Sequence, residues 1–552
     1  MKRTIVIISK ILLIGIFCHN LYSINLSIDY KIIPQSKDIV YSKNKSYILD
    51  YTSYISFSEN NPELENCAVL LQEYIDQSCG LYIEAYPSDV TFPEERSIYL
   101  SIDNQLANGA FKFSITPEHI LIVGSDYNSI VSGVQYFRKL ISSQSNLYQN
   151  DAQLISINSI NNASIKKSSN SPKVDFPSAE VHYIPNTENR AFILQNYAPE
   201  VNEAYVLKLL DVLSLHGFNV LCCSSTLSNK VYNQATLLGI KILNSPNYIS
   251  NVVDLKLPIS DLFNISDIVD GVIFNYDANN SNLSQILPKL AAIEEIQWST
   301  KADINFVDFC KRLEKIISVY NLNKYSYSDD VFNIQNEVAI DSTNKNTTIS
   351  LFTYDENPII LSINDEIMHY NEPIILSKSS DISAITARKG IKAKEINFDF
   401  DFDINKATYS CVKCDSTIFS NNIKPNLQNL IDGLKSSSKK SLNQWVEFNA
   451  DTIEINIDLP ETKKISKLSL NSIIDHYNST SIKKIRILAS SNGNNYSEID
   501  LQKVRSPKVN EDGIALYTVK FKSQEARFVK LIIYPQQTNG CNKILIDEII
   551  LN

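Results

Sequence analysis

The sequence predicts a multidomain protein in which an α/β half is followed by an all-β half. At 552 residues, and with ~150 residues in an ordinary domain, the chain should hold three to five domains. Residues 190–225 read as strand, helix and strand, because two continuous apolar runs flank a helical pattern that ends at Gly217. Beyond Val331, apolar and polar residues alternate with period two between polar turns, which is typical of β-sheets.

The N-terminus is typical of a secretory signal. Two basic residues precede a mostly apolar run from Ile5 to Phe17, and we expect residues 1–23 to be removed. A membrane anchor is the less favoured alternative, because the run is short and Lys10 interrupts it. Cys18 leaves lipidation open beside plain secretion. We therefore expect export to the periplasm, the cell surface or the medium, with no integral membrane segment after cleavage.

The net charge argues against nucleic-acid binding, and the cysteine spacing argues against a zinc site. The net charge of −10, without a stripe of Lys and Arg, argues against nucleic-acid binding. Cys411 and Cys414 form a C-x-x-C with no second pair at zinc-ligand spacing, so we expect a local disulfide or two free thiols. Cys222 and Cys223 are adjacent on a predicted strand, where we expect them to fill the core.

Residues 24–145 are predicted to form a small α+β domain. A first helix begins after Asn61-Pro62 and ends at Gly80, since these residue types favour helix starts and stops. The other expected elements are three strands and a second helix, at Ser97–Ile102, Phe111–Thr116, His119–Val123 and Asn128–Ile141. Residues 146–173 are rich in Ser and Asn and are expected to be a linker.

Three segments of this first half carry a family resemblance. They are GVQYFRKL from Gly133, RAFILQ with LSLHGFNVLCCSS from Arg190, and PKLAAIEEIQWS from Pro288. In order, they resemble the end of the α+β domain, the first βαβ unit and the last helix of the catalytic barrel in family-20 glycoside hydrolases, the β-N-acetylhexosaminidases. The resemblance implies that residues 24–145 buttress a (β/α) barrel at residues 174–325.

The length of residues 174–325 implies that such a barrel is truncated. The segment has ~150 residues, whereas a full eight-stranded barrel needs ~250. We therefore expect a partial barrel remnant of four parallel strands with two open edges. Open edges need cover in a compact domain, and we expect it from the buttress domain, the linker or a second protomer in a homo-oligomer.

The catalytic residues that the resemblance implies are missing. The family uses a Glu general acid and a preceding Asp that orients the substrate's acetamido group, in a pocket walled by tryptophans. Asp-Glu pairs occur only outside the barrel segment, at residues 355–356, 365–366 and 547–548. Gln195 replaces the Asp of the first strand, and neither Trp298 nor Trp445 falls on a pocket position. We therefore predict no catalytic residue.

A few single residues of the segment remain as candidates. Arg190 matches the family's sugar-binding arginine and is predicted to bind substrate, with a surface ion pair as the alternative. His182 and His216 have no Ser or Cys partner at a telling spacing, so satisfied surface or core positions are favoured. Five acidic residues in or near the segment show no spacing that would pair them: Glu200, Glu203, Asp211, Asp270 and Asp277. Asp211 matches an Asp within the corresponding helix of the family, which predicts a structural role for it.

The C-terminal part carries a second resemblance. Residues 331–403 read as a small β-sandwich of short strands. Six motifs then follow: LIDG at Leu430, QWVEF at Gln444, IEINIDL at Ile453, IRILASSNGNNYSEI at Ile485, ARFVKLII at Ala526 and LIDEIIL at Leu545. In this order they resemble a discoidin (coagulation factor 5/8 C-type) domain, a β-sandwich of jelly-roll type, over residues 404–552.

The discoidin resemblance implies a binding site and a metal site. Such domains commonly bind glycans or lipid headgroups, and many hold a structural calcium. Asp432 and Glu548 match positions that often help to form the calcium site, where oxygen ligands from distant segments tie the sandwich together. The alternative is that both acids bond to turns. No cofactor is expected to be required.

Together these expectations favour one function and leave two alternatives. The favoured function is an exported, catalytically degenerate β-N-acetylhexosaminidase relative that binds glycans containing N-acetylhexosamine. The first alternative is an active enzyme that cleaves terminal β-linked N-acetylglucosamine or N-acetylgalactosamine. The second is a structural or adhesive surface protein. Function is decided by the site and not by the fold.

Overall fold

The computed structural model describes residues 26–552 except 37, 44, 90–91, 144–171, 196–201, 266–267, 277–281, 301, 364–365, 389–390, 392, 415–425, 437–444, 475–480, 506, 508, 510–512 and 537–542. The predicted signal, most of the predicted linker and the candidates Glu200 and Asp277 lie outside these residues. The chain divides into two compact units, residues 1–331 with 389–391 and residues 332–388 with 392–552. No helix in the described part is long and apolar enough to span a membrane.

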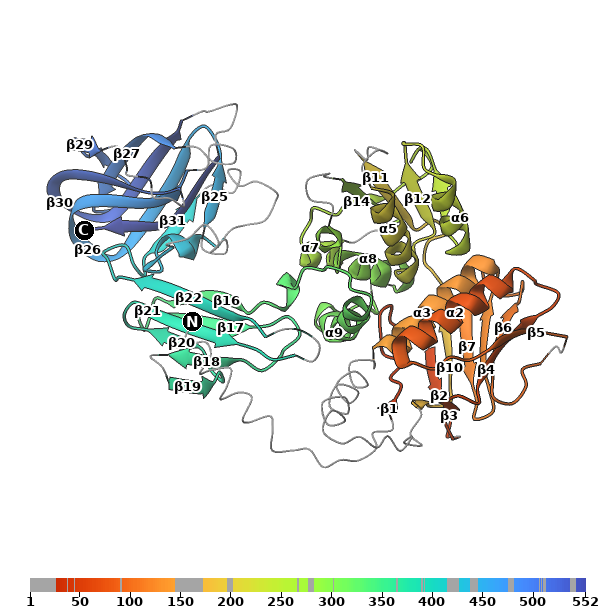
Figure 1. Cartoon of the computed structure of the whole chain (residues 1–552). Helices are drawn as coiled ribbons and strands as arrows, with labels where there is room; N and C mark the ends of the chain where they lie inside the picture. Colours follow the sequence, from red (N-terminus) through yellow and green to blue (C-terminus); the bar gives the residue numbers. More distant parts are fainter. Residues whose placement is uncertain are drawn as a thin grey trace, which may run out of the picture. The chain divides into compact units, whose positions relative to one another are not determined.

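The first unit begins with a seven-stranded mixed sheet and two helices packed together against it (Figure 1). The strand order is β2-β10-β7-β8-β6-β4-β5, and a small second sheet has the order β1-β9-β3. The bounds are β1 (Leu26–Ser27), β2 (Asp38–Tyr41), β3 (Tyr47–Leu49), β4 (Tyr54–Ser58), α2 (Leu64–Cys79), β5 (Ala85–Ser88), β6 (Ser97–Ile102), β7 (Phe111–Ile115), β8 (Ile120–Gly124), α3 (Tyr127–Ser142), β9 (Val174–Phe176) and β10 (Ala179–Tyr183).

Local sequence determines where the two helices begin and end. Helix α2 ends as predicted at Gly80, which adopts φ 68° and donates its amide to the Asp76 carbonyl at 2.7 Å. This left-handed conformation is one that glycine reaches without steric cost. Helix α3 begins after Asp126, whose carboxylate accepts the Ser129 amide at 2.8 Å and so satisfies an otherwise unpaired donor.

A five-stranded parallel sheet follows, with the order β13-β12-β11-β15-β14. The last strand of the series, β15, pairs with the first, β11, so that Ala191 lies opposite Gly271. The bounds are β11 (Ala191–Gln195), α5 (Glu203–Leu215), β12 (Val220–Cys223), α6 (Asn229–Leu237), β13 (Lys241–Leu243), β14 (Val252–Asp254), α7 (Ile259–Phe263), β15 (Gly271–Asn275), η2 (Leu283–Gln285), α8 (Lys289–Trp298) and α9 (Phe306–Leu322).

The sequence predicts four parallel strands here, and that number is wrong. Strand β14 lies in a run that reads as a loop, because it has only three residues and none of them is fully buried. One face of the sheet is covered in part by the connection before β14. A Cβ atom added at Gly271 would lie 2.9 Å from Cγ2 of Ile249, so that side chain packs directly on the strand. Cys222 and Cys223 are both 2% exposed, which confirms that they fill the core.

Four helices of the first unit meet around buried charges. Glu294 of α8 accepts hydrogen bonds from Nζ of Lys139 on α3 and from Nδ1 of His216, the latter at 2.8 Å. His216 Nε2 in turn lies 2.8 Å from the hydroxyl of Tyr320 on α9. Lys139, Glu294 and His216 are at most 2% exposed. Burial lowers the pKa of His216, so the imidazole is neutral and its Nε2 accepts a hydrogen bond from the Tyr320 hydroxyl.

Two further ion pairs extend this network. Arg138 of α3 donates to Asp211 of α5 at 2.8 Å, and its guanidinium stacks on Tyr74 at 4.2 Å. Arg312 of α9 makes two bonds to Glu295 of α8, at 2.7 and 3.0 Å. Asp211 therefore has a structural role, as predicted. The network ties α3 of the α+β part to the helices of the parallel sheet.

The second unit consists of two β-sandwich regions. The smaller has sheets of order β16-β17-β20 and β19-β18-β21-β22-β24, and the larger has an eight-stranded sheet of order β25-β31-β26-β30-β27-β28, with β23 on β26 and β29 on β30. The bounds are β16 (Gln335–Asp341), β17 (Asn346–Phe352), β18 (Ile360–Ile363), β19 (Glu366–His369), β20 (Ile374–Leu376), β21 (Ser380–Ile385), β22 (Glu395–Phe402), β23 (Cys411–Cys414), η6 (Leu427–Leu430), β24 (Leu434–Lys435), β25 (Val446–Asn449), β26 (Ile453–Ile473), β27 (Ile482–Ser490), β28 (Ser497–Glu498), β29 (Leu501–Arg505), β30 (Ile514–Pro535) and β31 (Lys543–Leu551).

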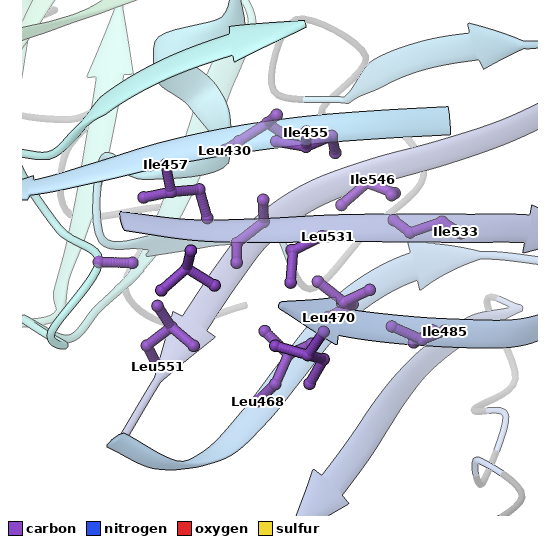
Figure 2. Packing of buried hydrophobic residues seen from close by; sticks show 14 of the residues in the cluster. Leu430, Ile455, Ile457, Leu468, Leu470, Ile485, Leu531, Ile533, Ile546 and Leu551 are labelled. Carbon is purple, nitrogen blue, oxygen red and sulfur yellow. The ribbon is translucent and has the colours of Figure 1, made fainter. Parts of the chain in front are cut away.

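Alternating apolar side chains form the core of the larger sandwich. Figure 2 shows residues of this core, among them Ile455, Leu470, Leu531 and Ile546, which are all fully buried. The smaller sandwich has its own core around Ile349. Strand β24 lies beyond the predicted boundary at residues 403–404 yet pairs with β22, so the larger region supplies a strand to the smaller one.

We expect the Glu294 network to contribute strongly to the stability of the first unit. Replacing Glu294 by Ala leaves Lys139 buried without its partner, a change that costs about 3–5 kcal/mol. The matched control is Asp29→Ala, which breaks an exposed 2.6 Å pair with Lys315 and should cost at most about 1 kcal/mol. Trp298 fluorescence during urea denaturation, in a Trp445→Phe background, measures both. Equal losses of unfolding free energy in the two variants would contradict a strong contribution of the Glu294 network.

We also expect the first unit to lose stability in acid. Because burial lowers the pKa of His216 below 6.5, the unfolded chain binds this proton at higher pH than the folded chain. This contribution is fully present above pH 6.5 and is lost as the pH falls, at up to about 1.4 kcal/mol per pH unit. His216→Gln cannot titrate, so its denaturation midpoint should depend less on pH between 6.5 and 5. If the midpoint of His216→Gln depended on pH as strongly as that of the wild type, His216 would not be the source of the acid sensitivity.

Candidate functional site

The carboxyl ends of the parallel strands are the first place to look for chemistry, because α/β sheets bind ligands there. In the described residues these ends are Gln195, Cys223, Leu243, Asp254 and Asn275. Asp254 is the one acid among them, and its carboxylate accepts the Lys256 amide at 2.9 Å. The described strand ends therefore present no pair of carboxyl groups.

The other acidic candidates of the parallel-sheet region are bound to neighbours. Glu203, at the start of α5, accepts the Ser228 hydroxyl at 2.5 Å and lies 3.5 Å from Lys230. These contacts lower the pKa of Glu203, and the hydrogen bond from Ser228 has the largest effect. A general acid instead needs a raised pKa. Asp270 accepts hydrogen bonds from Ser250 and Asn251. Neither side chain is arranged as a proton donor.

The Asp-Glu pairs lie in the second unit. Asp355 is 6% exposed and accepts two bonds from Arg388, at 2.6 and 2.7 Å. Burial acts to raise the pKa of Asp355, but these bonds lower it overall. Its neighbour Glu356 is in a turn with φ 55°, and residue 365 lies outside the described residues. Asp355 therefore forms a buried ion pair with Arg388.

Arg190 is buried just before β11, at the end opposite to the strand ends described above. Its Nε donates to the Gly217 carbonyl at 2.6 Å and its Nη1 to the Thr187 carbonyl at 3.0 Å. The guanidinium also stacks on Trp298 at 4.8 Å, and the residue is 4% exposed. These contacts give Arg190 a structural role that differs from the surface ion pair considered above. A role in binding sugar stays a prediction.

Three carboxyl groups are buried together in the larger sandwich region. Asp432, Asp547 and Glu548 are at most 1% exposed. Their hydrogen bonds come from amides: Leu434 N donates to Asp432 at 2.8 Å, Asn405 Nδ2 to Glu548 at 3.0 Å, and Ser436 N to Asp547 at 2.5 Å.

Each of these acids keeps one oxygen without a partner. Asp432 Oδ2, Asp547 Oδ1 and Glu548 Oε2 are buried and find no hydrogen-bond partner in the described structure. Burial raises the pKa of all three, that of Asp547 to about 7. The repulsion between Asp432 and Glu548 raises the pKa of Glu548 further. Buried like charges of this kind are costly unless they are protonated or neutralised by a cation.

The arrangement supplies some of the ligands for a hard cation. Asp432 and Glu548 come from segments far apart in the chain, and their unpartnered oxygens are the type that Ca²⁺ prefers. Within the described ranges, no group of three or more His, Cys, Asp or Glu side chains is grouped to hold a metal. The two carboxylates therefore fit a calcium ion provided that backbone carbonyls and water complete the six to eight ligands it takes.

The cysteine pair is not a disulfide. Neither Cys411 nor Cys414 is part of a disulfide in the described structure, and both lie on strand β23. Three residues of extended strand span ~10 Å, which exceeds the ~7 Å that a disulfide allows between Cα atoms. Of the two alternatives left by the sequence, the structure supports free thiols.

The C-terminal region matches a known domain family. Residues 412–549 match the family model described as the F5/8 type C domain, so the larger sandwich region is a domain of this type. This confirms the resemblance seen in the six motifs. No curated protein matches the chain.

Solved structures with some likeness to the chain are β-N-acetylhexosaminidases. The GH20 exo β-N-acetylglucosaminidase from Vibrio harveyi is 10% identical with a TM-score of 0.39, covering 56% of this chain and 80% of that one. The GH20 β-N-acetylhexosaminidase from Streptomyces coelicolor A3(2) is 8% identical with a TM-score of 0.36, covering 54% and 97%. The chitobiase of Flavobacterium johnsoniae is 10% identical with a TM-score of 0.38, covering 53% and 73%. At these values the likeness carries no argument about activity.

Sequence reasoning missed two features of these sites. Asp547 was not recognised as a third buried acid, because alternation along a strand predicts that one of two adjacent residues is exposed. The signal was present, since Asp547 and Glu548 interrupt an otherwise apolar run from Ile544 to Leu551. The role of Glu294 was also missed, because its partners Lys139 and His216 come from two distant segments.

Proposed function

We propose that the protein is an exported glycan-binding protein, related to the β-N-acetylhexosaminidases and without their hydrolytic activity. The observation that carries this proposal is the position of the acids. All three Asp-Glu pairs of the sequence lie outside residues 174–325. In the structure, Asp355 is held by Arg388, and Asp547 and Glu548 are buried in the F5/8 type C domain.

We infer further that the five-stranded sheet is a remnant of a (β/α) barrel. In a closed barrel of parallel strands the last strand pairs with the first, and β15 pairs with β11. Strands β12 and β13 follow on one side and β14 on the other, which is the order left when the middle strands are deleted. A homo-oligomer that covers β13 and β14 stays a prediction, which light scattering of the purified chain would test.

The F5/8 type C domain is the proposed glycan-binding part. Its resemblance to discoidin domains implies sugar or lipid-headgroup recognition, and we propose glycans containing N-acetylhexosamine as the ligands. An active β-N-acetylhexosaminidase and a structural or adhesive protein without sugar affinity are the alternatives. Export is likewise part of the proposal, and rests on the N-terminal sequence.

We expect the full chain to bind β-linked N-acetylglucosamine oligosaccharides saturably in isothermal titration. Glucose oligomers of equal length, which lack the acetamido group, serve as the matched control ligand and should bind more weakly. Flat titrations with both sugars would contradict the proposal and favour the structural alternative. Equal heats for both would retain sugar binding but remove N-acetylhexosamine as the preferred ligand.

We also propose that Asp432 and Glu548 hold a structural calcium ion. When bound, the ion neutralises two buried charges and ties the segment after η6 to strand β31. A ligand at 100 times its Kd stabilises the folded state by about 2.7 kcal/mol. The proposal rests on the unpartnered oxygens of these two residues.

Calcium removal should therefore lower the melting temperature of the second unit. EDTA should shift its calorimetric transition down, and added Ca²⁺ should restore it. Glu548→Gln keeps the shape but removes the charge, and should abolish the response to Ca²⁺. Glu498→Gln breaks the ion pair with Arg486, a pair at the surface of the same unit, and should leave the response intact. A wild-type melt that is unchanged by EDTA and Ca²⁺ would sink the calcium assignment.

A further inference from the structure

An open groove of about 790 Å³ lies in the second unit. The residues that line it include Cys411 of β23, Gln428 of η6, the stretch of β26 from Asp458 to Pro460, and Arg527 of β30. None of the residues that line the groove belongs to the group of Asp432, Asp547 and Glu548.

The groove lies beside an interruption of the sheet. Strands β26 and β30 pair in register up to Asp458 and resume at Lys463, so their ladder has an irregularity between these two residues. Pro460 falls inside this interruption and has no amide hydrogen to donate to a ladder. A break of this kind bends a strand and is common beside functional sites.

An ion pair spans the break and holds both sides in place. Asp458 Oδ1 lies 2.8 Å from Arg527 Nη2, and the two side chains are 42% and 30% exposed. Both side chains are therefore partly accessible to a ligand while the ion pair keeps them close together. Because the charges cancel, the groove gives no net attraction to a strongly charged ligand.

The rest of the lining is amphipathic. Leu427, Val412 and Pro460 supply apolar surface, and Gln428, which is exposed, supplies an amide. Apolar walls with a few placed polar groups are typical of ligand sites, whose volumes are ~300–1,000 Å³. A sugar matches this lining, because its ring carries both C–H faces and hydroxyl groups. A phosphate would meet one arginine that is already paired, and an acyl chain would leave the ion pair and the amide unsolvated.

We propose that this groove binds a short neutral oligosaccharide, with Arg527 and Asp458 bonding to its hydroxyls and Gln428 to its hydroxyl or acetamido groups. The proposal rests on the proposed glycan-binding function and gives it a location. It adds a site on the face of the F5/8 type C domain formed by β23, η6 and the break in β26.

The test is titration of the full chain with the β-linked N-acetylglucosamine trisaccharide. Arg527→Ala should raise the Kd at least ten-fold, and Gln428→Ala should raise it to a smaller extent. The matched control is Arg486→Ala, which removes an equally exposed partner from an ion pair with Glu498 in the same domain. It should change the Kd less than two-fold.

A second readout uses the unmodified chain and does not depend on how the variants fold. Cys411 at the groove is an exposed free thiol, whereas Cys414 is half-buried on the same strand and serves as the internal reference. The trisaccharide should slow the reaction of Cys411 with a small neutral maleimide at least five-fold, measured on the labelled peptide by mass spectrometry. The rate at Cys414 should change less.

The outcomes separate this inference from the function on which it rests. Trisaccharide binding that is lost in Arg527→Ala, with protection of Cys411, supports the groove. Binding that persists in Arg527→Ala without protection of Cys411 overturns the groove and leaves the glycan-binding function standing at another site. An absence of binding in the wild-type chain overturns both.

Discussion

The first unit depends on the buried carboxylate of Glu294. It accepts bonds from Lys139 and His216, and so joins the α+β part to the helices around the parallel sheet. A buried charge is tolerated only where several partners satisfy it. This requirement fixes the mutual position of four helices more tightly than apolar contact would, since each partner must lie within bonding distance. These contacts hold together the helices that surround the five-stranded sheet.

The buried charged side chains fall into two groups, those that are held by partners and those that keep an oxygen without a partner. Glu294, Glu295, Asp211 and Asp355 are all engaged by basic side chains, and Arg190 is engaged by backbone carbonyls and Trp298. Residues of these types are the ones that sequence comparison offers as catalytic or sugar-binding candidates. In the described structure their contacts are structural, and a sugar-binding role of Arg190 stays a prediction. Asp432, Asp547 and Glu548 differ, because each retains an oxygen without a partner in the described structure.

Much of the fold could be predicted from the sequence, because continuous apolar runs and helix-ending glycines act locally. The strand–helix–strand unit after Arg190 and the helix that ends at Gly80 are examples, and the six C-terminal motifs identified the F5/8 type C domain. Strand β14 could not be predicted, because three half-buried or exposed residues show no periodicity. The candidate functional residues were harder to predict than the fold. The motifs predicted Asp432 and Glu548 as metal ligands, and that role stays a prediction. The contacts of Arg190 and Glu294 depend on partners that only the folded chain brings together.

The central claim is that this chain retains glycan binding without glycoside hydrolysis. The most direct test is hydrolysis of an aryl N-acetyl-β-glucosaminide and its galacto epimer at high protein concentration, from acidic to neutral pH, beside an active GH20 enzyme. The account predicts no turnover above a mock preparation, because the described strand ends offer no pair of carboxyl groups for the chemistry. Turnover that disappears in Asp254→Asn or Glu203→Gln would contradict it.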